Sequence, residues 1–151
     1  MAVRIRQDAW KLSTVNVWHP TLLWYAKGIR EVQKLGIAKP TSWRFQAAIH
    51  DYDALSEALR PPADPKPSTA VQNQYWKQCQ HFSWFFLPWH RWYLYYFEQI
   101  IAKAVASVGG PADWSLPYWN YSDTSNANAL KLPPAFIATT LPDGSPNPLR
   151  V

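Results

Sequence analysis

Two histidines and the chain's only cysteine lie close together in one aromatic stretch, from Cys79 to Glu98. This stretch reads CQHFSWFFLPWHRWYLYYFE and carries ten aromatic rings. An imidazole buried among apolar side chains is costly unless a partner binds its nitrogens, and a metal ion is a partner that offsets the cost. The sequence therefore predicts a metal centre with His81 and His90 as two ligands and His50 as the third.

The two histidines of this stretch cannot belong to one straight helix if they share an ion. They are nine positions apart, and at about 100° per residue this spacing puts them on opposite helical faces. Pro88 disfavours helix at Leu87 and suits the first turn of a new helix. We therefore expect His81 on a turn or a short helix end, and His90 in the first turn of a helix that runs from about 88 to 107.

The third candidate ligand is expected on a separate helix. The sequence PTS at 40–42 is a capping signal for a helix from about Trp43 to Asp51. Gln46 lies one helical turn before His50, on the same face. This face therefore offers room for an ion and for a side chain that hydrogen-bonds to its ligands.

The remaining chain is divided by proline and glycine. Residues 1–17 are expected to lie across the surface, followed by a helix near 20–35 with His19 as a packing or capping residue. Residues 53–75 are proline-rich and predict an irregular loop, and the segment after Trp114 has little periodicity. The remaining large rings of the aromatic stretch are predicted core residues: Trp84, Trp89, Trp92, Tyr93, Tyr95 and Tyr96.

Composition excludes several classes of function. The chain has 151 residues, which suits one domain. Its net charge of +5 comes from scattered basic residues, so no nucleic-acid partner is predicted. A single cysteine excludes an internal disulfide and a cysteine-rich zinc site. With neither a membrane-length apolar run nor a visible signal peptide, we expect a soluble chain with no membrane partner.

Three blocks of sequence resemble one family. WRFQAAIHDYD at 43–53, HFSWFFLPWHRWYLYYFEQII at 81–101 and LPYWNYSD at 116–123 are similar to the first copper half of tyrosinases and catechol oxidases. These polyphenol oxidases are type 3 copper proteins, as are molluscan haemocyanins. The resemblance implies a mainly α-helical fold, the CuA half of a four-helix bundle with long irregular loops.

The same resemblance assigns roles to individual residues. It implies that His50, His81 and His90 are the catalytic copper ligands of the first site, called CuA. Cys79 stands two residues before His81, as in fungal and molluscan members whose cysteine forms a thioether bond to that histidine, and unlike plant members. Phe86 occupies a position where the family often packs an aromatic ring on the ligand histidines.

The second copper site of the family has no counterpart here. No histidine follows His90, whereas the family binds O2 between two copper ions and takes three further histidines for the second, called CuB. We therefore expect residues 1–151 to be the amino-terminal portion of the domain. Helices near 20–35, 43–55 and 88–107 would form two walls of the bundle. A second polypeptide or the remaining segment would supply CuB, and without it a large apolar face should be exposed.

Three functions agree with these residues. The first is oxidation of phenols and o-diphenols to o-quinones with O2, in an enzyme active only with its CuB half. The choice between monophenols and diphenols stays open, because the family sets it with residues of that half. The second is a haemocyanin-like reversible O2 carrier. The third is a mononuclear three-histidine metal-binding module without oxidase activity.

Overall fold

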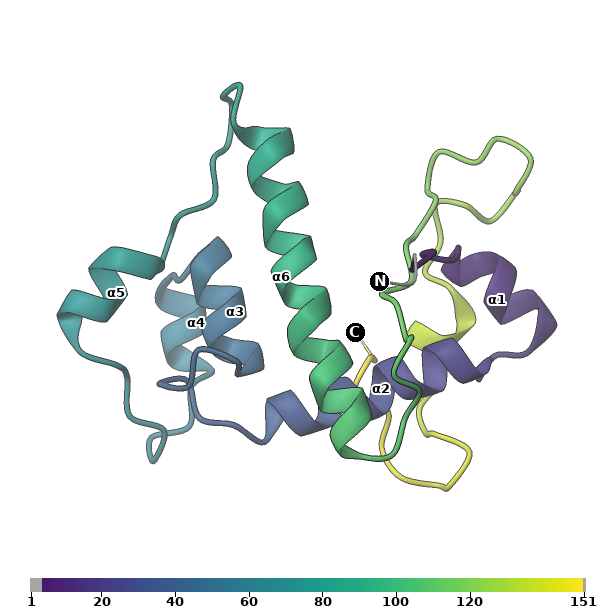
Figure 1. Cartoon of the computed structure of the whole chain (residues 1–151), viewed down its shortest axis with the longest axis horizontal. Coiled ribbons are helices and arrows are strands. Elements are labelled where there is room, and N and C mark those ends of the chain that lie inside the picture. The colour runs from purple at the N-terminus through teal and green to yellow at the C-terminus, as the bar shows by residue number, and fades with distance from the viewer. Residues whose placement is uncertain (1–3, 151) are drawn as a thin grey trace. The chain divides into compact units, whose positions relative to one another are not determined.

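The chain is mainly α-helical, which confirms the predicted fold class. A computed structural model describes residues 4–150, so residues 1–3 and 151 of the predicted domain lie outside the described residues. Within 4–150, β structure is limited to the isolated bridges Asp8–Tyr118 and Thr140–Pro146. The helices (Figure 1) are α1 Ala9–Val15, α2 Pro20–Gln33, α3 Trp43–His50, α4 Ala54–Ala58, α5 Thr69–Tyr75, α6 Phe86–Ser107 and the 3-10 helix η1 Pro134–Phe136.

The chain forms two compact units. Among the described residues, unit 1 comprises 4–30 and 101–150, and unit 2 comprises 31–100. The segment after Trp114, whose sequence has little periodicity, contributes to a buried core. It joins unit 1, where Ala135 packs with Ala9, Leu12 and Leu22 in a buried cluster.

Close packing in unit 1 depends on a glycine. A Cβ on Gly28 would lie 2.8 Å from a methyl group of Val105 and 3.1 Å from one of Ile101. Because these distances are shorter than van der Waals contact, α2 and the end of α6 can approach closely here only with glycine at position 28. Trp114 completes this core, with its indole N–H donating to the Thr21 carbonyl at 3.0 Å.

Unit 2 is built around a smaller buried cluster. Ile37, Phe45, Ala48 and Trp76 form it. The segment between α4 and α5 is anchored to this core by Asp64. Both oxygens of its carboxylate accept a hydrogen bond from the Ile37 amide, at 2.8 and 3.0 Å.

The helix that carries His50 begins as predicted and ends earlier. Ser42 caps α3, its hydroxyl oxygen accepting from the Phe45 amide at 3.0 Å. However, α3 ends at His50, with Asp51 extended, so the predicted continuation to 51 or 55 is wrong. Residues 53–75 are not wholly irregular either, because they contain the short helices α4 and α5, capped by Asp53 and Ser68.

The break before the last long helix agrees with the prediction. His81 lies outside any helix, and α6 begins at Phe86, which puts Pro88 in its first turn. Within the predicted surface segment, residues 4–17 contain a short helix, because Asp8 caps α1. Among the described residues, no helix combines the length and the apolar character needed to cross a membrane.

Much of the aromatic stretch is exposed, contrary to the prediction that its rings are core. Trp84 is 97% exposed and Trp92 is 61% exposed, and Tyr95 and Tyr96 are also exposed. Trp89 and Tyr93 are partly buried. These exposed rings leave a large amount of apolar surface in this stretch.

Candidate metal centre

The segment that carries Cys79 and His81 is held against the end of α3. After α5, the Lys77 amide donates to the Ala48 carbonyl at 2.9 Å, and the Gln78 amide donates to the Ile49 carbonyl at 2.8 Å. These two hydrogen bonds use carbonyls that the last turn of α3 leaves without intrahelical partners. They bring the following residue, Cys79, beside His50.

Two non-glycine residues with positive φ bracket this segment. Lys77 has φ 57° and Phe82 has φ 53°. Non-glycine residues adopt this left-handed conformation rarely, and it clusters at functional sites. The chain therefore turns sharply on each side of Cys79 and His81, which directs both side chains toward α3 and the start of α6.

The structure brings the three predicted histidines together. The ring centroids are 5.5 Å apart for His50 and His81, 5.7 Å for His50 and His90, and 6.3 Å for His81 and His90. Each ring is steeply inclined to the other two. An ion about 2 Å from a nitrogen of each ring needs comparable ring spacing.

The hydrogen bond of His90 fixes its tautomer. Its Nδ1 lies 2.7 Å from the Phe86 carbonyl, and a carbonyl can only accept, so Nδ1 carries the proton. The neutral ring therefore keeps a lone pair on Nε2. A backbone carbonyl that orients a histidine in this way is a common feature of metal centres.

Cys79 lies between two of the histidines. Its Sγ is 3.3 Å from Nε2 of His90 and 3.5 Å from Nε2 of His81. Ligand atoms of His50, Cys79 and His90 all lie within 4.8 Å of one another, which makes them a group that could hold a metal ion. His81 is not a member of this tighter group.

The surroundings favour the neutral forms of His50 and Cys79 before a metal binds. Burial is the main cause that lowers the pKa of His50 below 6.5, and the nearby His90 and His81 lower it further. A neutral imidazole is the form that binds metal. Burial, with a smaller contribution from Asp51, raises the pKa of the Cys79 thiol.

Aromatic rings surround the histidines on the α6 side. The Phe86 ring centroid lies 4.3 Å from that of His90 and 6.2 Å from that of His81. Trp89 contacts His90 at 4.9 Å and His50 at 6.1 Å. Rings packed on imidazoles restrict their rotation and exclude water from one side of the centre.

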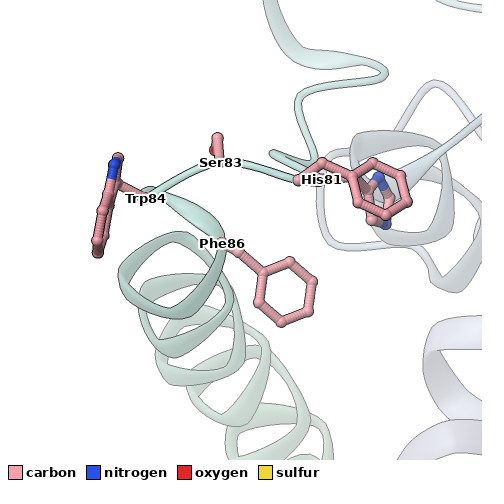
Figure 2. A pocket seen from close by; sticks show the side chains of 5 residues that line it. His81, Ser83, Trp84 and Phe86 are labelled. Atoms are coloured by element: carbon pink, nitrogen blue, oxygen red, sulfur yellow. The ribbon is translucent and has the colours of Figure 1, made fainter.

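An open apolar pocket lies next to His81. It has a volume of about 500 Å³ and is lined by His81, Phe82, Ser83, Trp84 and Phe86. Figure 2 shows that Trp84 projects away from His81 and Phe86. A flat, neutral ring is the kind of ligand that suits such a lining.

Two contacts were not expected from the sequence. The Gln46 side chain does not face His50, because its amide donates to the Pro40 carbonyl at 2.7 Å. Instead the Gln46 backbone carbonyl accepts from the Tyr93 hydroxyl at 2.9 Å, which joins α3 to α6 beside the centre. Burial is the main cause that raises the pKa of Tyr93 to about 12, so the hydroxyl keeps its proton. Helical periodicity places Tyr93 on the His90 stripe, but it does not identify this acceptor.

Comparison with known proteins points to one family. Residues 40–149 match the family model described as the common central domain of tyrosinase. Tyrosinase HcTyr1 of Hahella sp. (strain CCB-MM4) is 40% identical over 153 residues, covering 93% of this chain and 32% of that protein. The chloroplastic polyphenol oxidase of Spinacia oleracea is 36% identical over 144 residues, covering 95% of this chain and 19% of that protein. The chain thus spans a third or less of the length of these relatives.

Proposed function

Because the chain belongs to the tyrosinase family, we propose that it supplies one copper centre of an enzyme that oxidises phenols and o-diphenols to o-quinones with O2. In this proposal His50, His81 and His90 are the ligands of CuA in a dinuclear type 3 site. The observation that carries it is the convergence of these three imidazoles, with centroids 5.5 to 6.3 Å apart.

The donor set fits copper. Imidazole nitrogens bind both Cu(I) and Cu(II), and three of them leave a coordination position open. Copper supplies the exchange of electrons with O2 and the phenol. His90 is held for this task by its bond to the Phe86 carbonyl. Phe86 packs on the ligand rings, and the apolar pocket beside His81 would bind a neutral aromatic ring and exclude water.

The second copper would come from outside residues 1–151. Chain positions 91–151 contain no histidine, so we propose that the CuB ligands come from a further segment or a second polypeptide. The exposed rings of the aromatic stretch support the proposal that this further segment or polypeptide covers them. Phe82 is fully exposed and Trp84 is 97% exposed. Large apolar side chains exposed in such number are typical of a surface that binds another segment or protein.

We further propose that Cys79 forms a thioether bond to His81. Cys79 Sγ lies 3.5 Å from His81 Nε2 and 3.3 Å from His90 Nε2, so the sulfur is within reach of either ring, and the resemblance to family members with the same C-x-H spacing selects His81. Forming the bond removes the thiol hydrogen and one ring hydrogen, and O2 takes up the two electrons. Copper-loaded protein exposed to O2 should therefore lose two hydrogen atoms in mass and its titratable thiol, whereas zinc-loaded protein should keep both.

The proposed function is tested by assembling the complete site. This chain, produced together with the segment that carries the CuB ligands and loaded with copper, should consume O2 and convert catechol to a coloured o-quinone. His81→Ala in the same assembly should abolish quinone formation, whereas His19→Ala should not. Reversible O2 uptake without quinone would instead favour a haemocyanin-like carrier.

A mononuclear metal-binding module is the second candidate function. The closeness of His50, Cys79 and His90 favours it, because two imidazoles and a thiolate can bind zinc without a second half. One zinc ion per chain, retained when His81 is replaced by alanine and lost when Cys79 is replaced by serine, would support this function against the oxidase.

A further inference from the structure

A row of aromatic side chains in contact with one another extends from the histidines through unit 2. We call Trp89, Tyr93 and Phe97 of α6, together with Trp43 of α3, the aromatic file. Trp89 and Tyr93 stack with centroids 5.1 Å apart at 11°, and Tyr93 and Phe97 stack at 6.4 Å and 16°. Trp43 meets Phe97 edge-on at 6.0 Å. Its three α6 members are spaced four residues apart, so they lie along one face of the helix.

The two ends of the aromatic file have different surroundings. At one end, Trp89 contacts His90 at 4.9 Å and His50 at 6.1 Å. In the middle, Phe97 is 8% exposed. At the other end, Trp43 is 38% exposed and reaches solvent. The aromatic file therefore connects the candidate metal centre to the surface through ring contacts alone.

The residue types of the aromatic file are suited to carrying oxidising equivalents. Indole and phenol are the aromatic side chains that lose an electron most readily, whereas the Phe97 ring is not itself oxidised and only bridges Tyr93 to Trp43 by ring contact. The Tyr93 hydroxyl donates to the Gln46 carbonyl, which is too weak a base to take the proton. An oxidised Tyr93 is thus not stabilised by deprotonation, so the electron vacancy moves on to an indole that reaches solvent.

We propose that the aromatic file is an electron relay that removes strong oxidising equivalents from the copper centre when no phenol is bound. This inference rests on the proposed function, because the oxidant is a partly reduced oxygen species generated from O2 at copper. That species takes one electron from the Trp89 indole and one proton from water. Trp43 then transfers an electron to the oxidised Trp89 through Tyr93 and Phe97, and loses its N–H proton to solvent. A soluble reductant such as ascorbate restores Trp43.

The first experiment maps oxidation products in the full copper-loaded chain. The bound copper is first reduced and the excess reductant is removed. The protein is then treated with hydrogen peroxide without phenol, and its peptides are analysed by mass spectrometry. Wild type should accumulate hydroxytryptophan or N-formylkynurenine at Trp43. In Trp89→Phe this product should fall several-fold, while 2-oxohistidine at His50 and His90 should rise. In Trp43→Phe the product should appear at Trp89.

Two tryptophans serve as internal controls. Trp92→Phe should behave as wild type, because Trp92 lies on the same helix but packs on Tyr95 and Tyr96. An oxidant that diffuses out of the site would mark Trp84, which is 97% exposed, before Trp43. Oxidation at Trp84 with Trp43 unaffected by Trp89→Phe would overturn the relay, as would damage confined to histidines in both wild type and Trp89→Phe.

A second experiment needs no copper. Cys79 is the only cysteine in the chain, so a thiol-reactive ruthenium(II) photosensitiser can be attached beside His90 in the metal-free protein. After flash oxidation of the ruthenium, a tryptophan radical should form several-fold more slowly in Trp89→Phe than in Trp92→Phe. Equal rates would contradict the relay. Failure to bind copper would instead contradict the proposed function, so the two failures are distinguishable.

Discussion

Each unit contains one histidine and one tryptophan whose surroundings contrast with those of their counterparts in the other unit. In unit 1, His19 Nδ1 accepts from the Thr21 amide at 3.3 Å at the start of α2, and Trp114 is 3% exposed with its N–H bonded. In unit 2, the His90 Nε2 points at a thiol and another histidine lies nearby, and Trp84 is 97% exposed. Residue type alone therefore does not distinguish structural from chemical roles. The partners of each side chain do.

The largest expected effect separates the two kinds of tryptophan. Trp114→Ala should lower the free energy of unfolding by about 3–5 kcal/mol, because it leaves a cavity in the unit 1 core. Trp84→Ala should change it by about 0.5 kcal/mol or less, since the ring is exposed. Urea unfolding of the metal-free chain measures both values. A large loss in Trp84→Ala would mean that this ring is packed in solution, and the contrast between the units would fail.

The next expected effect separates the two kinds of histidine. His90→Ala should weaken copper binding by at least about 100-fold, because loss of a ligand exceeds the loss from a residue that only orients one. His19→Ala should bind copper as wild type does and should lose only the capping interaction, about 1 kcal/mol of stability. Competition with a chromophoric chelator gives the affinities. Equal affinities in the two variants would show that the three converging histidines are not the copper ligands.

A smaller effect on stability is expected when the polar side chain that hydrogen-bonds to loop backbone is replaced in each unit. In unit 1 this side chain is Asn147. The Asn147 amide donates to the carbonyls of Ala135 and Ala138, both at 2.8 Å, and its oxygen accepts from the Leu149 amide. Asn147→Ala should cost about 2 kcal/mol, because it leaves buried carbonyls unpaired.

The corresponding change in unit 2 is Asp64→Asn. It should cost about 1 kcal/mol, since an amide keeps one oxygen for the Ile37 N–H. Chemical denaturation measures both changes. A loss in Asp64→Asn as large as that in Asn147→Ala would mean that the carboxylate's charge, and its pairing with Arg44, contributes more than the hydrogen bond alone.

The sequence was most informative where a residue has strong local stereochemistry. Pro88 destabilises any helix that continues through it from the preceding residues, so this one residue predicted the break between His81 and His90. Ser42 predicted the start of α3 through its capping oxygen. Both features depend on neighbouring backbone atoms only. They position two of the three candidate ligands.

The missed features depend on contacts between distant residues. No periodicity marks α4 and α5, since neither has a buried residue. The Gln46 side chain was expected beside His50 from helical phase alone, yet the Pro40 carbonyl competes for its amide. The exposure of Trp84 follows from the absence of packing partners among the described residues, which its aromatic character does not reveal.

The smallest expected effect concerns the surface ion cluster of unit 2. Hydrogen bonds from Tyr52, Arg60 and Lys66 lower the pKa of Glu57 from 4.5 to about 2. Because the pKa is lower in the folded state, the carboxylate's contribution to stability is complete above pH 4.5 and is lost as the pH falls toward 2. Glu57→Gln should therefore be less stable than wild type near neutral pH, and the difference should shrink across that acidic range. Urea midpoints of the two proteins at a series of pH values measure it. A difference that stays constant with pH would show that Tyr52, Arg60 and Lys66 do not hold the Glu57 carboxylate in solution.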